Sequence, residues 1–440
     1  MNIIKSIVFG REVGGGNILP VANPYSKKTL ANIELCAKTP LFSRSSNAQS
    51  RDDVIALVQG YADYLEVNKQ KLSSMAAKET GSPVRYHVRD CEAAIDYIRS
   101  IETYAPSHDK VYQYVAKGRI LFILSANQPI LTSVFTIVTA LIMGNTVVVK
   151  PSTKSPITVS TIVEMLLKHG VPSDVLHLFV TNHIVLGDTI RKGNFDAVLS
   201  FAGSHTNRKI STSCVVGGAE FMPENEGNDW CYVDEQVNIP LKIIAQMLTQ
   251  SVIKHNGQMC DSIRTILVHE SQCDKFTSEL CKEFSAVKIG NPLSKDTRVS
   301  SLMSGTQRYV FEQYGKKVFE DSERGIVRPT ILQPKDIEDV AKPAFAPIVY
   351  VLSVQSVKQV ITLYKKFNKH GLGFCLYSFN ESTVSKLTKS IDVARMNINT
   401  LHVDVQLHSP WGGIKKSGEG GPLYWFERMS NKKIINYGQF

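Results

Sequence analysis

The chain has 440 residues, 43 % of them hydrophobic and 20 % charged, which is typical of a soluble globular protein with two or three domains. The net charge of +10 is scattered without a dense basic run, which argues against nucleic-acid binding. The eight cysteines show no spacing typical of a zinc site, so we expect neither a metal nor disulfides. We find no convincing signal peptide and no bilayer-spanning stretch, so we expect a cytoplasmic protein that does not bind membranes.

The first hundred residues change from strand-like to helical patterns. Residues 1–35 alternate short apolar runs with turns, and the glycines at 14–16 are best read as a hairpin turn, because no suitable helix follows them. From about 48 to 105 apolar residues recur every three or four positions, which predicts long helices. Ser50 stands before two aspartates and is a candidate N-cap.

Further along the chain, strands and helices alternate. "VYQYVAKGRILFILS" predicts two strands with a break at Lys117–Gly118, and a buried helix, the strand "NTVVVK" and another helix follow. The alternation resumes after residue 235 and continues through "AFAPIVYVLSV" and "FCLYSF". Such alternation predicts parallel sheets with helices on both faces. Two α/β domains joined near residue 230 are the most economical architecture.

Polar residues follow several of the predicted strands. Asn127 lies in "SANQP", Lys150 in "KPST" and Gly203 in "FAGSH". Ligands of doubly wound sheets bind at the carboxyl ends of strands, although each residue alone is better explained as part of a polar loop. The GxGxxG fingerprint of dinucleotide-binding folds is absent.

Taken in order, several motifs resemble those of the aldehyde dehydrogenase superfamily. They are "SANQP", "GNTVVVKPS", "AVLSFAGS", "NGQMC" and "SPWGGIKKSGEGG", and the resemblance extends from about residue 18 to 436. It implies two doubly wound α/β domains and a small β-hairpin oligomerisation element. The cofactor-binding domain would comprise residues 1–110 and 121–229, the hairpin 111–120 with 430–440, and the catalytic domain 230–429. It also implies a homodimer, or a tetramer as the alternative.

The resemblance assigns catalytic roles. Cys260, which by itself would be read as a structural thiol, is the expected nucleophile that attacks an aldehyde to give a thiohemiacetal and then a thioester. Asn127 and the backbone N–H of Cys260 would form the oxyanion hole. The expected general base is Glu224, with Glu226 as the alternative. Asp261, directly after the nucleophile, would raise the pKa of the thiol unless it points away.

The resemblance also implies NAD or NADP as cofactor. Lys150 matches the lysine near the adenosine ribose, and Ser152 follows it in the same turn. Gly203 and Ser204 match the helix start beneath the pyrophosphate. NAD-preferring members often have Glu where this chain has Thr153, so we expect it to accept NADP.

One departure leaves the acyl acceptor open. The segment "PAFAPIV" resembles the family segment that holds the nicotinamide ribose. Phe345 matches the phenylalanine of that segment, but Pro343 stands where the family has a ribose-binding Glu. The expected activity is NAD(P)-dependent oxidation of a small-molecule aldehyde to a carboxylic acid. The alternatives are a CoA-acylating aldehyde dehydrogenase and a catalytically weak family member that acts as a binding protein.

Overall fold

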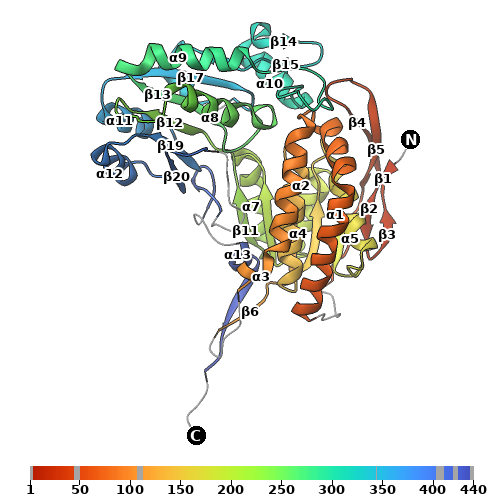
Figure 1. The fold of residues 1–440 in the computed structure, drawn as a ribbon. Helices are drawn as coiled ribbons and strands as arrows, with labels where there is room; N and C mark the ends of the chain where they lie inside the picture. The colour runs from red at the N-terminus through yellow and green to blue at the C-terminus, as the bar shows by residue number, and fades with distance from the viewer. Residues whose placement is uncertain are drawn as a thin grey trace.

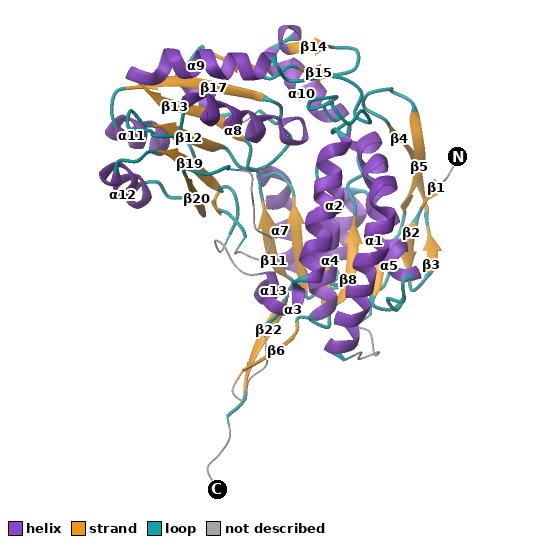
Figure 2. Cartoon of the chain, in the orientation of Figure 1, coloured by secondary structure: helices purple, strands orange, loops and turns teal. Residues whose placement is uncertain are grey.

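Two α/β lobes and a projecting two-stranded ribbon make up the computed structural model of the chain (Figure 1). The structure describes residues 3–43, 50–106, 112–342, 344–402, 411–419 and 425–436. Each lobe has its own sheet, and Figure 2 shows helices packed around both sheets. The predicted fold class, two doubly wound α/β sheets, is confirmed.

The first lobe contains a seven-stranded sheet in the order β11-β10-β7-β8-β9-β2-β3. Neighbouring strands are parallel from β11 to β9, whereas β2 and β3 run antiparallel. The strands are β2 (Ser6–Val8), β3 (Arg11–Val13), β7 (Arg119–Ile123), β8 (Thr146–Lys150), β9 (Leu176–Leu178), β10 (Ala197–Phe201) and β11 (Glu220–Glu224). Because β7, β8, β10 and β11 are parallel neighbours, their carboxyl ends meet at one edge of the sheet.

Helices cover the first sheet, and a smaller sheet lies beside it. The helices are α1 (Arg51–Thr80), α2 (Val84–Arg99), α3 (Ile101–Tyr104), α4 (Pro129–Ile142), α5 (Pro156–Lys168), α6 (His183–Arg191) and α7 (Ser204–Gly217). The smaller sheet consists of β1 (Ile3–Ile4), β5 (Thr29–Cys36) and β4 (Gly15–Ala22). The Ser50 side chain accepts a hydrogen bond from the Asp53 N–H, which confirms the predicted N-cap of α1.

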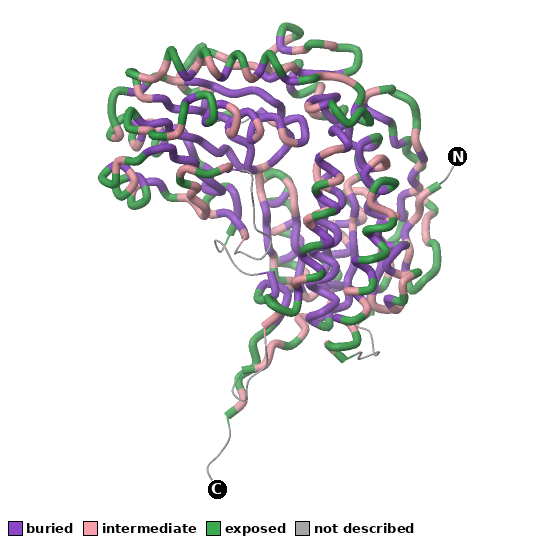
Figure 3. The backbone as a smooth tube through the Cα atoms, viewed as in Figure 1, coloured by how far each residue is buried: buried purple, intermediate pink, exposed green. Residues whose placement is uncertain are grey.

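The second lobe contains a six-stranded parallel sheet in the order β16-β17-β13-β12-β19-β20. The strands are β12 (Asp229–Val233), β13 (Ile263–His269), β16 (Thr330–Leu332), β17 (Ile348–Val354), β19 (Gly373–Tyr377) and β20 (Arg395–Ile398). The main helices are α8 (Leu241–Ile253), α9 (Glu270–Ser285), α10 (Ser304–Tyr314), α11 (Val357–Phe367) and α12 (Glu381–Ser390). The central strands are buried along most of their length (Figure 3), as their continuous apolar sequences require.

Shorter elements connect these parts. They are the 3-10 helices η1 (Lys254–Gly257), η2 (Lys316–Val318) and η3 (Ile337–Ala341), and the strands β14 (Phe319–Asp321), β15 (Ile326–Val327), β18 (His370–Gly371) and β21 (Ile414–Lys415). No helix in the described parts of the chain is long and apolar enough to cross a membrane.

The ribbon pairs two segments that are distant in sequence. Strands β6 (Tyr112–Ala116) and β22 (Ser430–Ile434) are antiparallel and project from the base of the first lobe (Figure 1). Just before β22, the short helix α13 (Trp425–Arg428) packs Trp425 and Phe426 into the core of the first lobe. The end of the chain therefore returns from the second lobe to the first.

Candidate active site

A cavity of about 630 Å³ is lined by residues of both lobes. Its lining includes Cys260, Asn127, Glu224, Glu226, Gly203 and Phe345, all of which were singled out from the sequence. Lys150, Ser152, Thr153 and Ser204 are not among the residues that line it. The fold thus brings the predicted catalytic residues together and leaves several predicted cofactor contacts outside this cavity.

The loop that carries Cys260 has an unusual backbone. His255, Asn256 and Gly257 in η1 have φ angles of 48°, 59° and 69°. A Cβ atom at Gly257 would lie 2.4 Å from the carbonyl carbon of Ala346, so only glycine fits this close approach. Asn256 stabilises the turn through two hydrogen bonds. Its Nδ2 donates to the Ser301 carbonyl at 2.8 Å, and its Oδ1 accepts from the Ser300 N–H at 2.7 Å.

Arg264, at the start of β13, secures the same loop from beneath. Its guanidinium donates to the backbone carbonyls of Gly257 at 2.7 Å, Met259 at 2.9 Å and Ala346 at 2.8 Å. Burial lowers the pKa of Arg264 to about 10. No motif in the sequence indicates this role for Arg264, and the available signal was a charged side chain within the apolar strand "IRTILVH".

Cys260 is half-buried in an acidic environment. Burial raises the pKa of its thiol, and the carboxylates of Asp261 and Asp229 raise it further. Arg395 opposes this effect, and its Nη2 lies 3.3 Å from Asp261 Oδ2. Asp261 thus acts on the thiol in the predicted direction, and the thiol needs a base to become a nucleophile at neutral pH.

Asn127 contacts the loop that carries Cys260 directly. It follows β7, and its Nδ2 donates a hydrogen bond of 2.7 Å to the carbonyl of Gln258. An amide nitrogen carries two hydrogens. The second has no hydrogen-bond partner among the described residues, so it is available to an oxygen atom in the cavity.

Glu224 is the last residue of β11 and is buried. Burial raises its pKa, whereas Arg428 of α13 forms an ion pair with it and lowers the pKa, as does a hydrogen bond with Trp411. A carboxylate with a raised pKa is suited to accept a proton near neutrality. Arg428 lies far from Glu224 in the sequence, and no sequence motif indicates that the two side chains meet.

Glu226 plays a different part from Glu224. Its carboxylate accepts hydrogen bonds from the backbone N–H of Ser204 at 2.5 Å and from the Ser204 hydroxyl at 2.6 Å. Although burial opposes the shift, His370 and Ser204 lower the pKa of Glu226 to about 2. An anion therefore already lies at the start of α7, where the sequence predicted that a pyrophosphate would bind.

The remaining predicted cofactor residues follow β8. Burial lowers the pKa of Lys150 to about 8. Ser152 accepts a hydrogen bond from the Lys154 N–H at 3.3 Å, and Thr153 is exposed. Across the cavity, the Phe345 ring lies 6.0 Å from the Arg264 guanidinium. Pro343 lies outside the described residues.

Comparison with known proteins identifies relatives along almost the whole chain. The sequence model of the Aldehyde dehydrogenase family matches residues 17–435. The lactaldehyde dehydrogenase of Methanocaldococcus jannaschii is 25 % identical, with 95 % of this chain and 96 % of the relative covered. The 3-sulfolactaldehyde dehydrogenase of Priestia megaterium is 22 % identical, with coverage of 95 % and 94 %.

Among solved structures, betaine aldehyde dehydrogenase from Staphylococcus aureus, in complex with NAD+, has a similar fold. The TM-score is 0.89 at 20 % identity, and the match covers 98 % of this chain and 94 % of that one. Together with the match over residues 17–435, this agreement settles the family that the sequence motifs had indicated. The chain belongs to the aldehyde dehydrogenase family.

Proposed function

We propose that this protein oxidises an aldehyde to a carboxylic acid, with Cys260 as the nucleophile and a nicotinamide cofactor. The observation that carries this proposal is the convergence of Cys260, Asn127 and Glu224 on one cavity from three separate segments and two lobes. These groups supply the nucleophile, an oxyanion donor and a base, the three functions that the reaction needs.

The proposed reaction uses each group in turn. Ionised Glu224 removes the proton of the Cys260 thiol, directly or through a water molecule, and the thiolate attacks the aldehyde carbon. The oxygen of the thiohemiacetal accepts hydrogen bonds from Asn127 Nδ2 and the Cys260 N–H, and such donors are typically worth about 3–4 kcal/mol each. When bound, a nicotinamide cofactor would accept the hydride that the thiohemiacetal carbon loses as it becomes a thioester. Glu224 then activates the water that hydrolyses the thioester.

The proposed cofactor contacts lie at the carboxyl ends of β8 and β10. Lys150, Ser152 and Thr153 would hold the adenosine ribose, and Lys150 suits a polar ligand because its buried ammonium has no ion-pair partner among the described residues. Gly203 and Ser204 would face the pyrophosphate, and Phe345 the nicotinamide. No carboxylate stands at Thr153 to repel a 2′-phosphate, so we propose that NADP is accepted.

An arginine cluster in the cavity suggests the class of aldehyde. Arg85 and Arg89, one turn apart on α2, and Arg298 line the cavity, and none of them forms an ion pair with a described residue. The Nε atoms of Arg85 and Arg298 are buried without a hydrogen-bond partner. Burial and repulsion by Arg298 lower the pKa of Arg85. We infer that the aldehyde carries an anionic group, and one relative is named for a sulfonated aldehyde.

Acyl transfer to CoA is the second candidate. It is favoured by the ion pair between Glu224 and Arg428, because a carboxylate held by a guanidinium is a weaker base toward water. In this reaction the thiol of CoA, and not water, would take the acyl group from Cys260.

The test is an absorbance assay of NAD(P)H formation with paired neutral and anionic aldehydes, with and without CoA. Acid formation without CoA supports hydrolysis, whereas thioester formation only with CoA supports the second candidate. Cys260→Ala should abolish turnover, and Cys273→Ala, which removes a half-buried thiol of α9 outside the cavity, should not. Turnover that survives Cys260→Ala would overturn the mechanism. No turnover with any aldehyde would favour the binding-protein alternative.

A further inference from the structure

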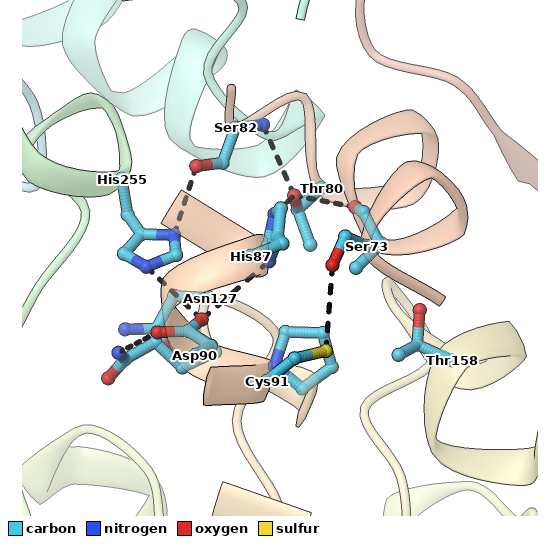
Figure 4. A network of polar contacts seen from close by, with 12 residues as sticks. Ser73, Thr80, Ser82, His87, Asp90, Cys91, Asn127, Thr158 and His255 are labelled. Carbon is cyan, nitrogen blue, oxygen red and sulfur yellow. Dashed lines mark hydrogen bonds and ion pairs between the residues drawn. The ribbon is translucent and has the colours of Figure 1, made fainter. Parts of the chain in front are cut away.

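Three buried side chains meet beside the nucleophile loop. His87 and Asp90 lie on α2 and His255 lies in η1, with exposed fractions of 0 %, 3 % and 0 % (Figure 4). One potential ligand atom of each side chain lies within 4.8 Å of the other two, and Oδ2 of Asp90 pairs with Nδ1 of His87 and Nε2 of His255. These atoms contact one another through the ion pairs of Asp90 with His87 and His255, but none of them has a hydrogen bond of ordinary geometry to a described residue. Buried polar atoms are nearly always satisfied, so this convergence calls for an explanation.

The hydrogen bonds of Thr80 indicate which ring nitrogen of His87 carries no proton. The hydroxyl of Thr80 donates its single hydrogen to the Ala76 carbonyl at 2.8 Å. It can therefore only accept from His87 Nε2, 3.0 Å away, which places the proton of a neutral imidazole on Nε2. The lone pair on Nδ1 of His87 then faces the Asp90 carboxylate at 3.7 Å. Two lone pairs in this arrangement repel each other unless a cation lies between them.

Each of the three side chains also has a polar partner on the atom that faces away from the cluster. Nε2 of His87 is bonded to Thr80, Nδ1 of His255 lies 3.0 Å from the Ser82 hydroxyl, and Oδ1 of Asp90 accepts from Gln128 at 3.3 Å. Metal-binding histidines and carboxylates typically have such outer partners, which orient the ligand atoms toward the metal.

The spacing of the three ligand atoms suits a metal ion. Nε2 of His255 lies 3.3 Å from Asp90 Oδ2, and tetrahedral zinc with bonds of about 2.0–2.1 Å places its ligand atoms about 3.3 Å apart. Nδ1 of His87 lies 3.7 Å from the same Asp90 oxygen, so both imidazole nitrogens face one carboxylate oxygen.

We propose that His87, Asp90 and His255 form a binding site for one divalent transition-metal ion of the zinc class. Two imidazoles and one carboxylate are a ligand set that such ions favour. Asp90 also lines the cavity that contains Cys260, which provides an entry route and room for a water molecule as a further ligand. The ion would connect α2 to the loop that carries the nucleophile.

The site can be tested by titrating the chelator-treated full-length protein with Co²⁺, whose visible absorption reports its ligands, and then displacing it with Zn²⁺. We expect one ion per chain, absorption typical of nitrogen and oxygen ligands, and a higher melting temperature with the metal. His87→Gln, Asp90→Asn and His255→Asn should each weaken binding at least about 100-fold. Thr80→Val removes an outer partner and should weaken it about 10–100-fold.

The matched control is His177→Gln, which removes a buried histidine outside the cluster and should leave binding unchanged. Circular dichroism shows which variants are folded, and titration of the wild-type protein needs no variant at all. Failure of the wild-type protein to bind either ion would overturn the proposal. So would binding that persists in all folded ligand variants, or sulfur-to-metal charge-transfer bands, which would assign the ion to cysteines.

Discussion

Asp261 and Cys260 show how neighbouring residues set the chemistry of a thiol. The carboxylate of Asp261 follows Cys260 directly in the chain, and its ion pair with Arg395 neutralises only part of its effect on the thiol. Because the thiolate is the reactive form, a raised pKa keeps most of the thiol protonated at neutral pH. The rate of alkylation by iodoacetamide should therefore rise with pH over the whole range up to the pKa of Cys260.

Asp261→Asn should shift this alkylation profile to lower pH. Removing the negative charge lowers the pKa of Cys260, and one pKa unit changes the thiolate fraction about tenfold at a pH below the pKa. We expect alkylation of Cys260, followed by peptide mass spectrometry, to be about three to ten times faster at pH 7. Asp274→Asn on the exposed face of α9 is the control. An unchanged profile in Asp261→Asn would show that the carboxylate has no effect on the thiol.

Glu226 raises a second question at this scale, because its carboxylate occupies the start of α7. A dinucleotide would bring its own negative charges to the same place, and two anions there repel each other. Glutamine at this position keeps an acceptor for the Ser204 N–H and removes the charge.

Glu226→Gln should therefore bind NADP+ more tightly. We expect Kd, measured by calorimetry or fluorescence, to fall about fivefold or more, which corresponds to roughly 1 kcal/mol. Glu381→Gln, in the first turn of α12 and far from the cavity lining, is the matched control and should leave Kd unchanged. Weaker binding in Glu226→Gln would mean instead that the carboxylate helps to hold the cofactor.

Among the elements, the loop between α8 and β13 depends most on a single side chain. Arg264 donates to carbonyls of both the Cys260 loop and the segment before β17, so it joins two parts of the cavity wall. A buried carbonyl that loses its donor costs about 1–3 kcal/mol. The loop conformation, with its three consecutive positive φ angles, relies on these bonds.

Arg264→Met should destabilise the protein by at least about 3 kcal/mol, because three carbonyls lose their donor and methionine offers none. The midpoint of urea unfolding measures this change. Arg308→Met removes an exposed arginine paired with Glu312 on α10, and surface pairs of this kind contribute about 0–1 kcal/mol. Equal midpoints for the two variants would contradict the role assigned to Arg264.

At the scale of the whole molecule, the ribbon of β6 and β22 is conspicuous. It forms a separate two-stranded sheet, and Tyr112, Val115 and Ile434 are 39 %, 36 % and 60 % exposed. An isolated two-stranded ribbon is marginally stable in water, and its open edges can pair with another chain. We therefore expect the ribbon to pack against a second copy of the protein.

Light scattering should give a mass near twice the 48.9 kDa of one chain. Val115→Asp places a charge on the ribbon and should shift the protein toward monomer. Val215→Asp, at a position on α7 that is 79 % exposed, should not. A monomeric wild-type protein would refute the dimer, and a mass near four chains would support a tetramer.

The sequence carried much of the fold and part of the site. Alternating apolar runs indicated two parallel sheets, because buried strands of such sheets must be apolar on both faces. Motif order indicated Cys260, Asn127 and Glu224, which all line one cavity. Arg428 and Arg264 could not be recognised in the same way, because their partners are carboxyl and carbonyl groups that only folding brings within reach.

By itself, the sequence determined which residues can do the chemistry and which strands carry them, since periodicity and motifs are local properties of the chain. Only the tertiary structure decided how those residues are tuned. Glu224 forms an ion pair with Arg428, whereas Glu226 accepts a hydrogen bond at the start of α7, although the two glutamates are only two positions apart. The tertiary structure also brought His87, Asp90 and His255 together. The physical reason is that pKa values and ligand geometry depend on burial and on neighbours distant in the sequence.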